Sequence, residues 1–409
     1  MQFNFLRHLV VALAAWSVTT AATADESNWS DRSNLNIRPG INPISHDVLA
    51  LNNYALWVVS LIGLLVVVLV FWAMIRHRRS VRPEPSKFHE NTFLEVTWTV
   101  IPVFILIALA WPATKLLIRM DDTSGSELTV KVTGSRWHWN YEYVAYEGNN
   151  DIGLSFYSNL ATPKDQYDNP VLPGGLFPYG TSKDLVGNGN VKKDHNYLLE
   201  VDKPLVLPSD TKIRFLITSD DVIHSWFVPD FGWKKDAIPG YINADWTEVP
   251  AKNEGTYYGN CAELCGKGHA FMPIEVKVVS KAKFKAWLAS QLEASKAGPD
   301  LTPFASLDEA MKEGETLFHG VGTCAICHGD KGQGGVGPAM AGNSFFTDAA
   351  KLPEHIHIVT HGKNAMPNFS GQLTPRQIAA VITYERNAFG NKSGQLVQPA
   401  DVAKAEQEK

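Results

Sequence analysis

Two uncharged apolar stretches in the first third of the chain constrain its fold more than any other feature. Residues 55–75 form a run of 21 residues without a charge, and residues 96–114 form another of 19. Each is long enough to cross a bilayer, where only a helix satisfies its own backbone polar groups. The loop between them contains Arg76, Arg78, Arg79 and Arg82, and loops this basic stay cytoplasmic. The sequence predicts a transmembrane hairpin over residues 54–120, with both ends on the outer side.

The first 24 residues have the features of a secretory signal peptide. Arg7 and His8 precede an apolar core over residues 9–18, and Ala22-Thr23-Ala24 offers small residues at a cleavage position. The apolar core is too short to span a bilayer comfortably. We therefore expect cleavage before Asp25, and we expect residues 25–53 to form an external segment ahead of the hairpin.

The chain beyond the hairpin divides into regions of different pattern. Its 409 residues predict two or more domains, and a formal net charge of only −5 gives no sign of a nucleic-acid partner. Short alternating segments separated by turn residues predict a β-sandwich over residues 121–280. The expected strands are 128–133, 137–143, 198–206, 212–219, 246–249, 255–259 and 274–279, with residues 148–192 as a long surface excursion.

The C-terminal third is expected to be helical. Residues 281–303 have the composition of a linker helix, which could also close the sandwich. Residues 304–392 predict a small all-α domain, with helices over 307–318, 352–360 and 374–388 and Thr374 as the N-cap of the last. Residues 393–409 are expected to form a loose polar tail.

All four cysteines lie in two motifs with metal-site spacing. The first runs Cys261-Ala262-Glu263-Leu264-Cys265-Gly266-Lys267-Gly268-His269-Ala270-Phe271-Met272. Two thiolates, an imidazole and a thioether in one loop are a soft ligand set suited to copper, and thiolates can bridge two copper ions. His224, expected at a strand end, could supply a second imidazole. Mononuclear blue copper and zinc are the alternatives, but the first leaves one cysteine idle and the second does not call for methionine. Disulfides would not require this spacing.

The second motif, Cys324-Ala325-Ile326-Cys327-His328, is the attachment signature of a c-type haem. The two cysteines would form thioethers to the haem, and His328 would be the proximal axial ligand. The distal ligand stays open. Met366 lies in a segment that resembles the distal loop of class I cytochromes c. The alternatives are Met340, His355, His357 and His361.

The segment Val222-Ile223-His224-Ser225-Trp226, followed by the Cys261–Met272 motif, resembles the CuA site of cytochrome c oxidase subunit II. The resemblance covers residues 40–280 and implies a cupredoxin-like sandwich with a dinuclear copper centre. The ligands that it implies are His224, Cys261, Cys265, His269, Met272 and the carbonyl oxygen of Glu263. It also implies that the Glu263 side chain helps to hold a magnesium ion shared with subunit I. With the C-terminal domain, the chain resembles oxidases whose subunit II carries a fused class I cytochrome c.

The resemblance assigns roles to two further residues. Trp137 matches the aromatic residue where electrons enter the copper domain, although Arg136 stands before it where many members have glutamine. A structural role, in which the tryptophans only cover the copper loop, is the alternative. Glu95, at the start of the second span, matches the mouth of a proton path into subunit I, but a carboxylate there can also be merely solvated.

These features predict the electron-input subunit of a proton-pumping terminal oxidase, in which subunit I reduces oxygen to water. The expected partners are subunit I, subunit III, cytochrome c or another periplasmic donor, and membrane lipid. The expected location is the bacterial inner membrane, with the copper and haem domains on the periplasmic side, where bacterial c-type haem is attached. A copper-containing nitric oxide reductase and a free-standing electron carrier are the competing hypotheses.

Overall fold

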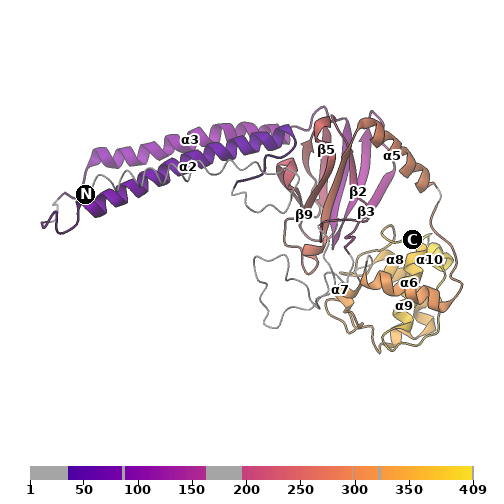
Figure 1. Cartoon of the computed structure of the whole chain (residues 1–409). Coiled ribbons are helices and arrows are strands. Elements are labelled where there is room, and N and C mark those ends of the chain that lie inside the picture. The colour runs from indigo at the N-terminus through magenta and orange to yellow at the C-terminus, as the bar shows by residue number, and fades with distance from the viewer. Residues whose placement is uncertain (1–35, 85–87, 163–195, 297, 321–323, 408–409) are drawn as a thin grey trace.

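The computed structural model describes residues 36–84, 88–162, 196–296, 298–320 and 324–407. Figure 1 shows three parts: two long helices side by side, a β-sandwich at one end of them, and a small helical domain next to the sandwich. The expected signal peptide lies outside the described residues, as does most of the expected excursion over residues 148–192.

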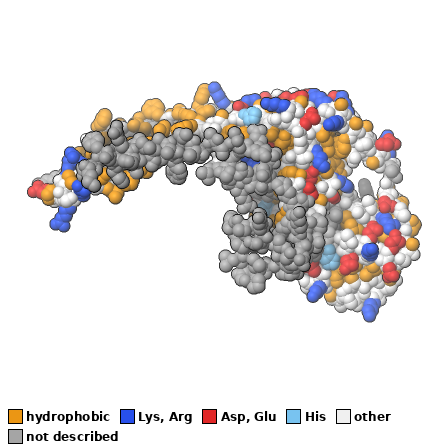
Figure 2. All heavy atoms as spheres, in the orientation of Figure 1, with side chains coloured by type: hydrophobic (Ala, Val, Ile, Leu, Met, Phe, Trp, Pro, Cys, Tyr) orange, Lys and Arg blue, Asp and Glu red, His pale blue; other side chains and the backbone are white. Residues whose placement is uncertain are grey.

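The membrane hairpin consists of α2 (Pro43–Arg76) and α3 (Thr92–Asp121). The most apolar part of each helix is not buried by any described part of the chain. Figure 2 shows apolar side chains along their surface. Two long helices with such a surface are stable in lipid rather than in water, so this is a membrane protein with two spans.

The ends of both helices nearest the sandwich are tied to it. The side-chain amide of Asn42, the N-cap of α2, donates hydrogen bonds to the Phe231 carbonyl at 3.0 Å and to Thr247 Oγ1 at 2.7 Å. Near the end of α3, the carbonyl of Arg119 accepts a hydrogen bond from Trp246 Nε1 at 2.9 Å. The hairpin therefore joins the sandwich through specific polar contacts at both helix ends.

The first helix begins earlier than its apolar stretch. Residues 43–53, expected in a separate external segment, form the start of α2. The cause is local, because an asparagine N-cap followed by proline is a strong helix start. Ile44 is fully buried in the sandwich core, which fixes this start in place.

In the part of the chain that the structure describes, ten strands form two five-stranded sheets, with strand orders β3-β2-β1-β5-β8 and β4-β10-β9-β6-β7. β1 runs antiparallel to β2 and parallel to β5, whereas β9 lies between β10 and β6 and is antiparallel to both. The strands are β1 (Leu128–Ser135), β2 (His138–Tyr146), β3 (Leu154–Ser158), β4 (Leu205–Pro208), β5 (Ile213–Ser219), β6 (His224–Val228), β7 (Trp233–Ala237), β8 (Asn243–Thr247), β9 (Gly255–Cys261) and β10 (Pro273–Val279).

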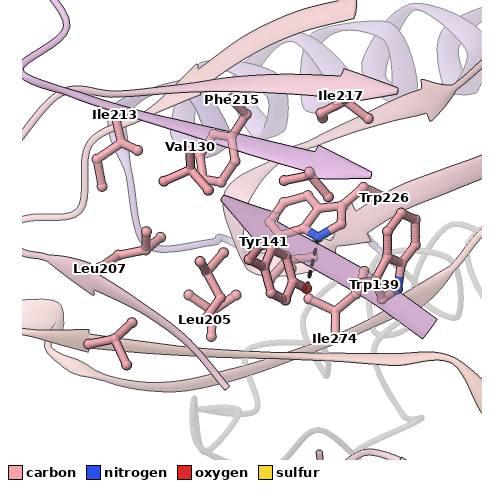
Figure 3. Close-up of a cluster of buried hydrophobic side chains, with 14 of the residues drawn as sticks. Val130, Trp139, Tyr141, Leu205, Leu207, Ile213, Phe215, Ile217, Trp226 and Ile274 are labelled. Atoms are coloured by element: carbon pink, nitrogen blue, oxygen red, sulfur yellow. Dashed lines mark hydrogen bonds between the residues drawn. The ribbon is translucent and has the colours of Figure 1, made fainter. Parts of the chain in front are cut away.

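Large aromatic and branched side chains from both sheets fill the sandwich (Figure 3). Trp139, Tyr141, Phe215 and Trp226 are each completely buried, and Trp226 Nε1 donates a hydrogen bond to the Tyr141 hydroxyl at 3.3 Å. Buried aromatic groups pack well when their polar atoms find partners. The result is a rigid core beneath the edge that carries the copper motif.

The strand predictions were wrong in three places. Residues 154–158 form β3 rather than part of an excursion, because they pair with β2 and complete that sheet. Apart from the strand end expected at His224, β6 and β7 were not predicted, since β6 is buried along nearly its whole length without alternation and β7 is largely charged. Residues 198–206 are not one strand, because residues 197–199 form a turn and β4 starts only at Leu205.

Helix α5 (Lys281–Ser295) both closes the sandwich and links it to the helical domain, as the sequence predicted. Phe284 and Leu288 are buried in the sandwich core, and the Phe284 ring lies 5.2 Å from the ring of Tyr146. From its end the chain passes to the helical domain (Figure 1). That domain contains α6 (Leu307–His319), α7 (Cys324–His328), α8 (Leu352–His361), α9 (Pro375–Asn387) and α10 (Pro399–Gln407). Thr374 caps α9 as predicted.

The prediction of a loose tail over residues 393–409 was wrong. α10 lies within residues 393–409, and Val397 and Val402 are both fully buried in the core of the helical domain. Ser370 donates a hydrogen bond to Glu406 at 2.8 Å. The polar composition hid a helix with one small apolar face, which is enough for packing against α8 and α9.

Candidate copper and haem sites

The copper motif lies where the end of β9 meets the start of β6. Cys261 is the last residue of β9, and it pairs across the sheet with Trp226, two residues after His224. His224 is fully buried, and its Nδ1 lies 3.9 Å from Cys261 Sγ. Cys265 Sγ lies 3.8 Å from Cys261 Sγ. The ligand atoms of these three residues lie within 4.8 Å of one another.

The other sequence-predicted ligands lie around the same two sulfur atoms. His269 Nδ1 and Met272 Sδ are each 3.5 Å from Cys265 Sγ, and the carbonyl oxygen of Glu263 is 3.3 Å from Cys261 Sγ. The structure therefore brings together all six donors named from the sequence. Two sulfurs at the centre with one imidazole nitrogen near each, a thioether and a carbonyl form a donor set that fits two copper ions.

The electrostatics of the cluster favour one thiolate and a correctly oriented imidazole. The hydrogen bond between the two thiols lowers the pKa of Cys261 and raises that of Cys265, so Cys261 is the more readily ionised of the two. Burial lowers the pKa of His224, but its contacts with Asp221 and Cys261 raise it overall. Asp221 Oδ1 lies 2.9 Å from His224 Nε2, which leaves Nδ1 directed at the sulfurs.

Two tryptophans of the aromatic segment hold the copper loop. Trp137 Nε1 donates a hydrogen bond to the Cys265 carbonyl at 3.1 Å, and Trp139 Nε1 donates one to the Met272 carbonyl at 3.3 Å. The loop backbone lies directly against Trp137, because a Cβ at Gly268 would be 2.3 Å from its ring. Both tryptophans therefore support the copper loop, and for Trp137 this structural role is independent of the predicted role in electron entry.

Sequence reasoning missed Asp221 and did not give Arg136 a contact. The backbone N–H and Nε of Arg136 donate to Asp221 Oδ2 at 2.8 and 3.0 Å. Burial opposes ionisation of Asp221, but hydrogen bonds from His224, Val222 and Arg136 lower its pKa well below the usual range. Its position three residues before His224 was the only signal in the sequence, and it is a weak one.

The haem motif forms a short helix at the surface of the helical domain. Cys324 and His328 are buried and Cys327 is partly buried, and burial raises the pKa of both thiols. His328 Nδ1 lies 2.9 Å from the carbonyl oxygen of Pro338. This contact occupies one ring nitrogen and leaves Nε2 for an iron ion, as a proximal ligand requires.

The candidate distal ligands differ in their surroundings. Met340 is 2% exposed and is packed in the core, whereas Met366 is partly buried in a tight turn. That turn is closed by two backbone hydrogen bonds with Lys363, of 3.1 and 3.0 Å. The three histidine candidates contact other side chains. His355 is buried with its Nε2 2.8 Å from Glu385, and the exposed rings of His357 and His361 stack on each other.

The two carboxylates with predicted roles are both exposed. Glu95 lies in the first turn of α3, where its side chain accepts a hydrogen bond from the Asn91 N–H at 3.3 Å. Glu263 is exposed, and its carbonyl oxygen is the atom that lies near Cys261 Sγ. Neither Glu95 nor Glu263 belongs to the cluster of His224, Cys261 and Cys265, the group of potential metal ligands found among the described residues.

Three family profiles match successive parts of the chain. "Cytochrome C oxidase subunit II, transmembrane domain" matches residues 30–116, and "Cytochrome C oxidase subunit II, periplasmic domain" matches residues 181–279. "Cytochrome C oxidase, cbb3-type, subunit III" matches residues 309–384.

Curated relatives match over three-fifths or more of the chain. A probable cytochrome c oxidase subunit 2 of Rickettsia conorii is 37% identical over 261 residues, which is 64% of this chain and 73% of that protein. The cytochrome c oxidase subunit 2 of Cereibacter sphaeroides is 34% identical over 255 residues, which is 61% of this chain and 78% of that protein. Among solved structures, the periplasmic domain of subunit II of cytochrome oxidase of Bradyrhizobium japonicum matches 42% of this chain and 98% of that one, with 34% identity and a TM-score of 0.31.

The matched domains agree with the donor atoms of the copper cluster and the haem motif. The subunit II domain implies a dinuclear copper centre, which the cluster of His224, Cys261 and Cys265 fits, and the cytochrome domain implies haem c. The chain belongs to the cytochrome c oxidase subunit 2 family, and it carries a cytochrome c domain fused to its C-terminal end.

Proposed function

We propose that this chain is the electron-input subunit of a haem-copper terminal oxidase. It accepts electrons at its haem c domain, relays them through the dinuclear copper centre and delivers them to subunit I, where oxygen is reduced to water with proton pumping. The observation that carries the proposal is the convergence of two thiols, two imidazoles and a thioether in a chain that also holds a haem attachment motif. Nothing in the comparisons favours a nitric oxide reductase.

When bound, the copper centre and haem c each take up and release one electron, with no bond formed or broken. The residues of the chain keep the ligands still. His224 and Cys261 are fixed on paired strands, and Trp137 and Trp139 hold the loop carbonyls. Ligands that are already positioned need little rearrangement when the charge changes.

The ligand assignment follows from the donor positions. We assign His224, Cys261, Cys265, His269, Met272 and the Glu263 carbonyl to copper, and Cys324, Cys327, His328 and Met366 to haem c. Met366 is preferred because Met340 is already packed in the core. We assign the point where electrons reach the copper domain to Trp137, since its indole N–H is bonded to the carbonyl of Cys265.

Membership of the family implies assembly with subunit I. We propose further that subunit III, cytochrome c or another periplasmic donor, and the surrounding lipid are partners. The basic loop between the spans supports a periplasmic location of the copper and haem domains, outside the bacterial inner membrane. Glu95, exposed next to that loop, is available for a proton path into subunit I. The exposed Glu263 side chain is available for a magnesium ion shared with subunit I.

The proposed division of the chain keeps most of the expected boundaries. Residues 1–24 are the signal peptide, 54–120 the membrane hairpin, 121–280 the copper domain and 281–303 the linker. Residues 25–53 are divided, because α2 begins at Pro43. The haem domain begins at residue 304 and extends through α10, since that helix packs within its core.

The test is oxygen uptake by the purified complex that contains this chain. A chemically reduced donor drives the reaction, and the wild type is compared with Cys261→Ser. We expect the variant to lose nearly all uptake, because a hydroxyl is a poor bridging ligand for copper. The absorbance of haem c serves as the control, since Cys261 lies outside the haem domain.

Two results would contradict the proposal. Unchanged oxygen uptake in Cys261→Ser, with copper absent from the variant, would show that electrons bypass this cluster. Consumption of nitric oxide without oxygen uptake by the wild-type complex would place the same electron relay in a nitric oxide reductase.

A further inference from the structure

The surface of the copper domain next to Trp137 is covered by the haem domain. Ile326 and Cys327 of the haem motif pack against the buried cluster that contains Trp137 and the two copper-site cysteines. Gly371 of the haem domain faces Tyr157 of β3, where an added Cβ would lie 3.7 Å from the tyrosine ring. Trp137 is only 7% exposed in this arrangement. A soluble donor would therefore meet the haem domain before it met Trp137.

Arg136 makes a hydrogen bond that crosses between the two domains. Its Nη2 donates to the carbonyl oxygen of Ala365, the residue before Met366, at 3.2 Å. The other edge of the same guanidinium donates from Nε to Asp221 Oδ2 at 3.0 Å. A continuous series of contacts thus runs from His224 through Asp221 and Arg136 to the turn that carries Met366.

The ion pair with Asp221 holds the Arg136 side chain that makes this contact. The side chain of Arg136 is 26% exposed and that of Asp221 is 14% exposed, so the ion pair is largely shielded from water. The backbone N–H of Arg136 also donates to Asp221, which fixes the position from which the side chain leaves. Arg136 is also close enough to Cys327 for its charge to lower the pKa of that thiol, against burial, which raises it. Arg136 thus lies near both haem-carrying segments.

We propose that Arg136 is a positioning residue that locks the haem domain onto the copper domain, so that Cys327, which would hold the haem, stays packed against the cluster that contains Trp137. The inference rests on the proposed electron relay and names the residue that sets its geometry. A planar guanidinium can serve a carboxylate and a carbonyl at once along two edges, whereas a lysine ammonium is a point donor on a flexible stem. Arg136 is therefore expected to be irreplaceable by lysine.

The experiment measures electron transfer from haem c to copper in the intact complex. A photoexcited ruthenium reductant reduces haem c within a laser flash, and reoxidation of the haem is followed by its absorbance. We compare the wild type with Arg136→Gln, Arg136→Lys and Lys131→Gln. Lys131 is the matched control, because it is a half-exposed cation of the same sandwich whose partner, Glu142, lies within that sandwich.

We expect haem reoxidation to be about tenfold slower in Arg136→Gln, since a hydrogen bond from a charged group is lost at the interface. Arg136→Lys should be slowed nearly as much, and Lys131→Gln should match the wild type. A second interface variant, Tyr157→Ala, should slow transfer without altering the copper signal in electron paramagnetic resonance. The Tyr157 ring packs against His138, which is not an assigned copper ligand, so this variant separates docking from damage to the copper site.

Three outcomes would overturn the inference. A transfer rate in Arg136→Gln within about twofold of the wild type would mean that Arg136 does not position the haem domain. Full rescue by Arg136→Lys would mean that charge alone matters. A slowed rate that is fully accounted for by an altered copper signal, with Tyr157→Ala unchanged, would place the role of Arg136 inside the copper site. Absence of haem-to-copper transfer in the wild type would instead refute the proposed function.

Discussion

One residue of the copper loop, Gly268, is required for the space that it leaves rather than for any chemical group. Gly268 has an ordinary φ of −90°, so its backbone would accept alanine, yet a Cβ there would lie 2.3 Å from the Trp137 ring. We predict that Gly268→Ala displaces either the loop or the indole, at a cost of about 1–3 kcal/mol in the free energy of unfolding, typical of overpacking. Copper content and the electron paramagnetic resonance signal should both fall.

Gly255→Ala is the control for that prediction. It lies in the same domain, and its added Cβ would be 3.7 Å from the Tyr257 hydroxyl, which is ordinary contact. It should bind copper like the wild type. Normal copper binding by Gly268→Ala would show that the loop can move away from Trp137 without consequence.

At the scale of elements, α10 shows how little apolar surface is needed to order a polar segment. Val397 and Val402 are fully buried, and each contributes on the order of 1.5 kcal/mol or more when removed from water. We predict that truncation after residue 392 lowers the free energy of unfolding of the haem domain by about 3 kcal/mol or more. Thermal unfolding followed by haem c absorbance measures the change.

Truncation after residue 407 is the matched control, because it leaves α10 whole. It should unfold at the wild-type temperature. If the longer truncation also unfolded at that temperature, the packing of α10 would contribute nothing to the stability of the haem domain.

At the scale of the whole molecule, the junction between the membrane hairpin and the sandwich contains a buried acid. Asp245 is fully buried on β8, and Lys235 lies 3.2 Å from it and 3.7 Å from Asp121 at the end of α3. Burial raises the pKa of Asp245 from 3.8 to about 6. The folded state therefore binds more protons than the unfolded state between these values, and stability is lost as the pH rises through that window.

We predict that this group lowers the free energy of unfolding by up to about 3 kcal/mol between pH 4 and pH 6. Asp245→Asn cannot titrate, so its loss of stability over that window should be smaller than that of the wild type by the same amount. The thermal midpoint of the purified complex, measured at each pH, compares the two. Parallel pH profiles for wild type and variant would contradict the assignment.

Much of this molecule could be predicted from local sequence. The two spans, the haem motif and five of the six copper donors lie in runs whose spacing alone carries the signal, since apolar length and ligand spacing are properties of neighbouring residues. Most strands of the sandwich followed from alternation, whereas β3, β6, β7 and α10 did not. Their composition is mixed, and only pairing with distant strands or helices orders them.

The sequence by itself determined the classes of cofactor and the two membrane spans, because metal ligands and apolar spans keep their chemical character in any fold. The tertiary structure alone decided how the sites are joined. Asp221 reaches Arg136 across 85 positions of sequence, and Arg136 reaches Ala365 across 229. No local pattern encodes a contact between a guanidinium and a distant backbone carbonyl, since every residue offers that same carbonyl and only packing selects one.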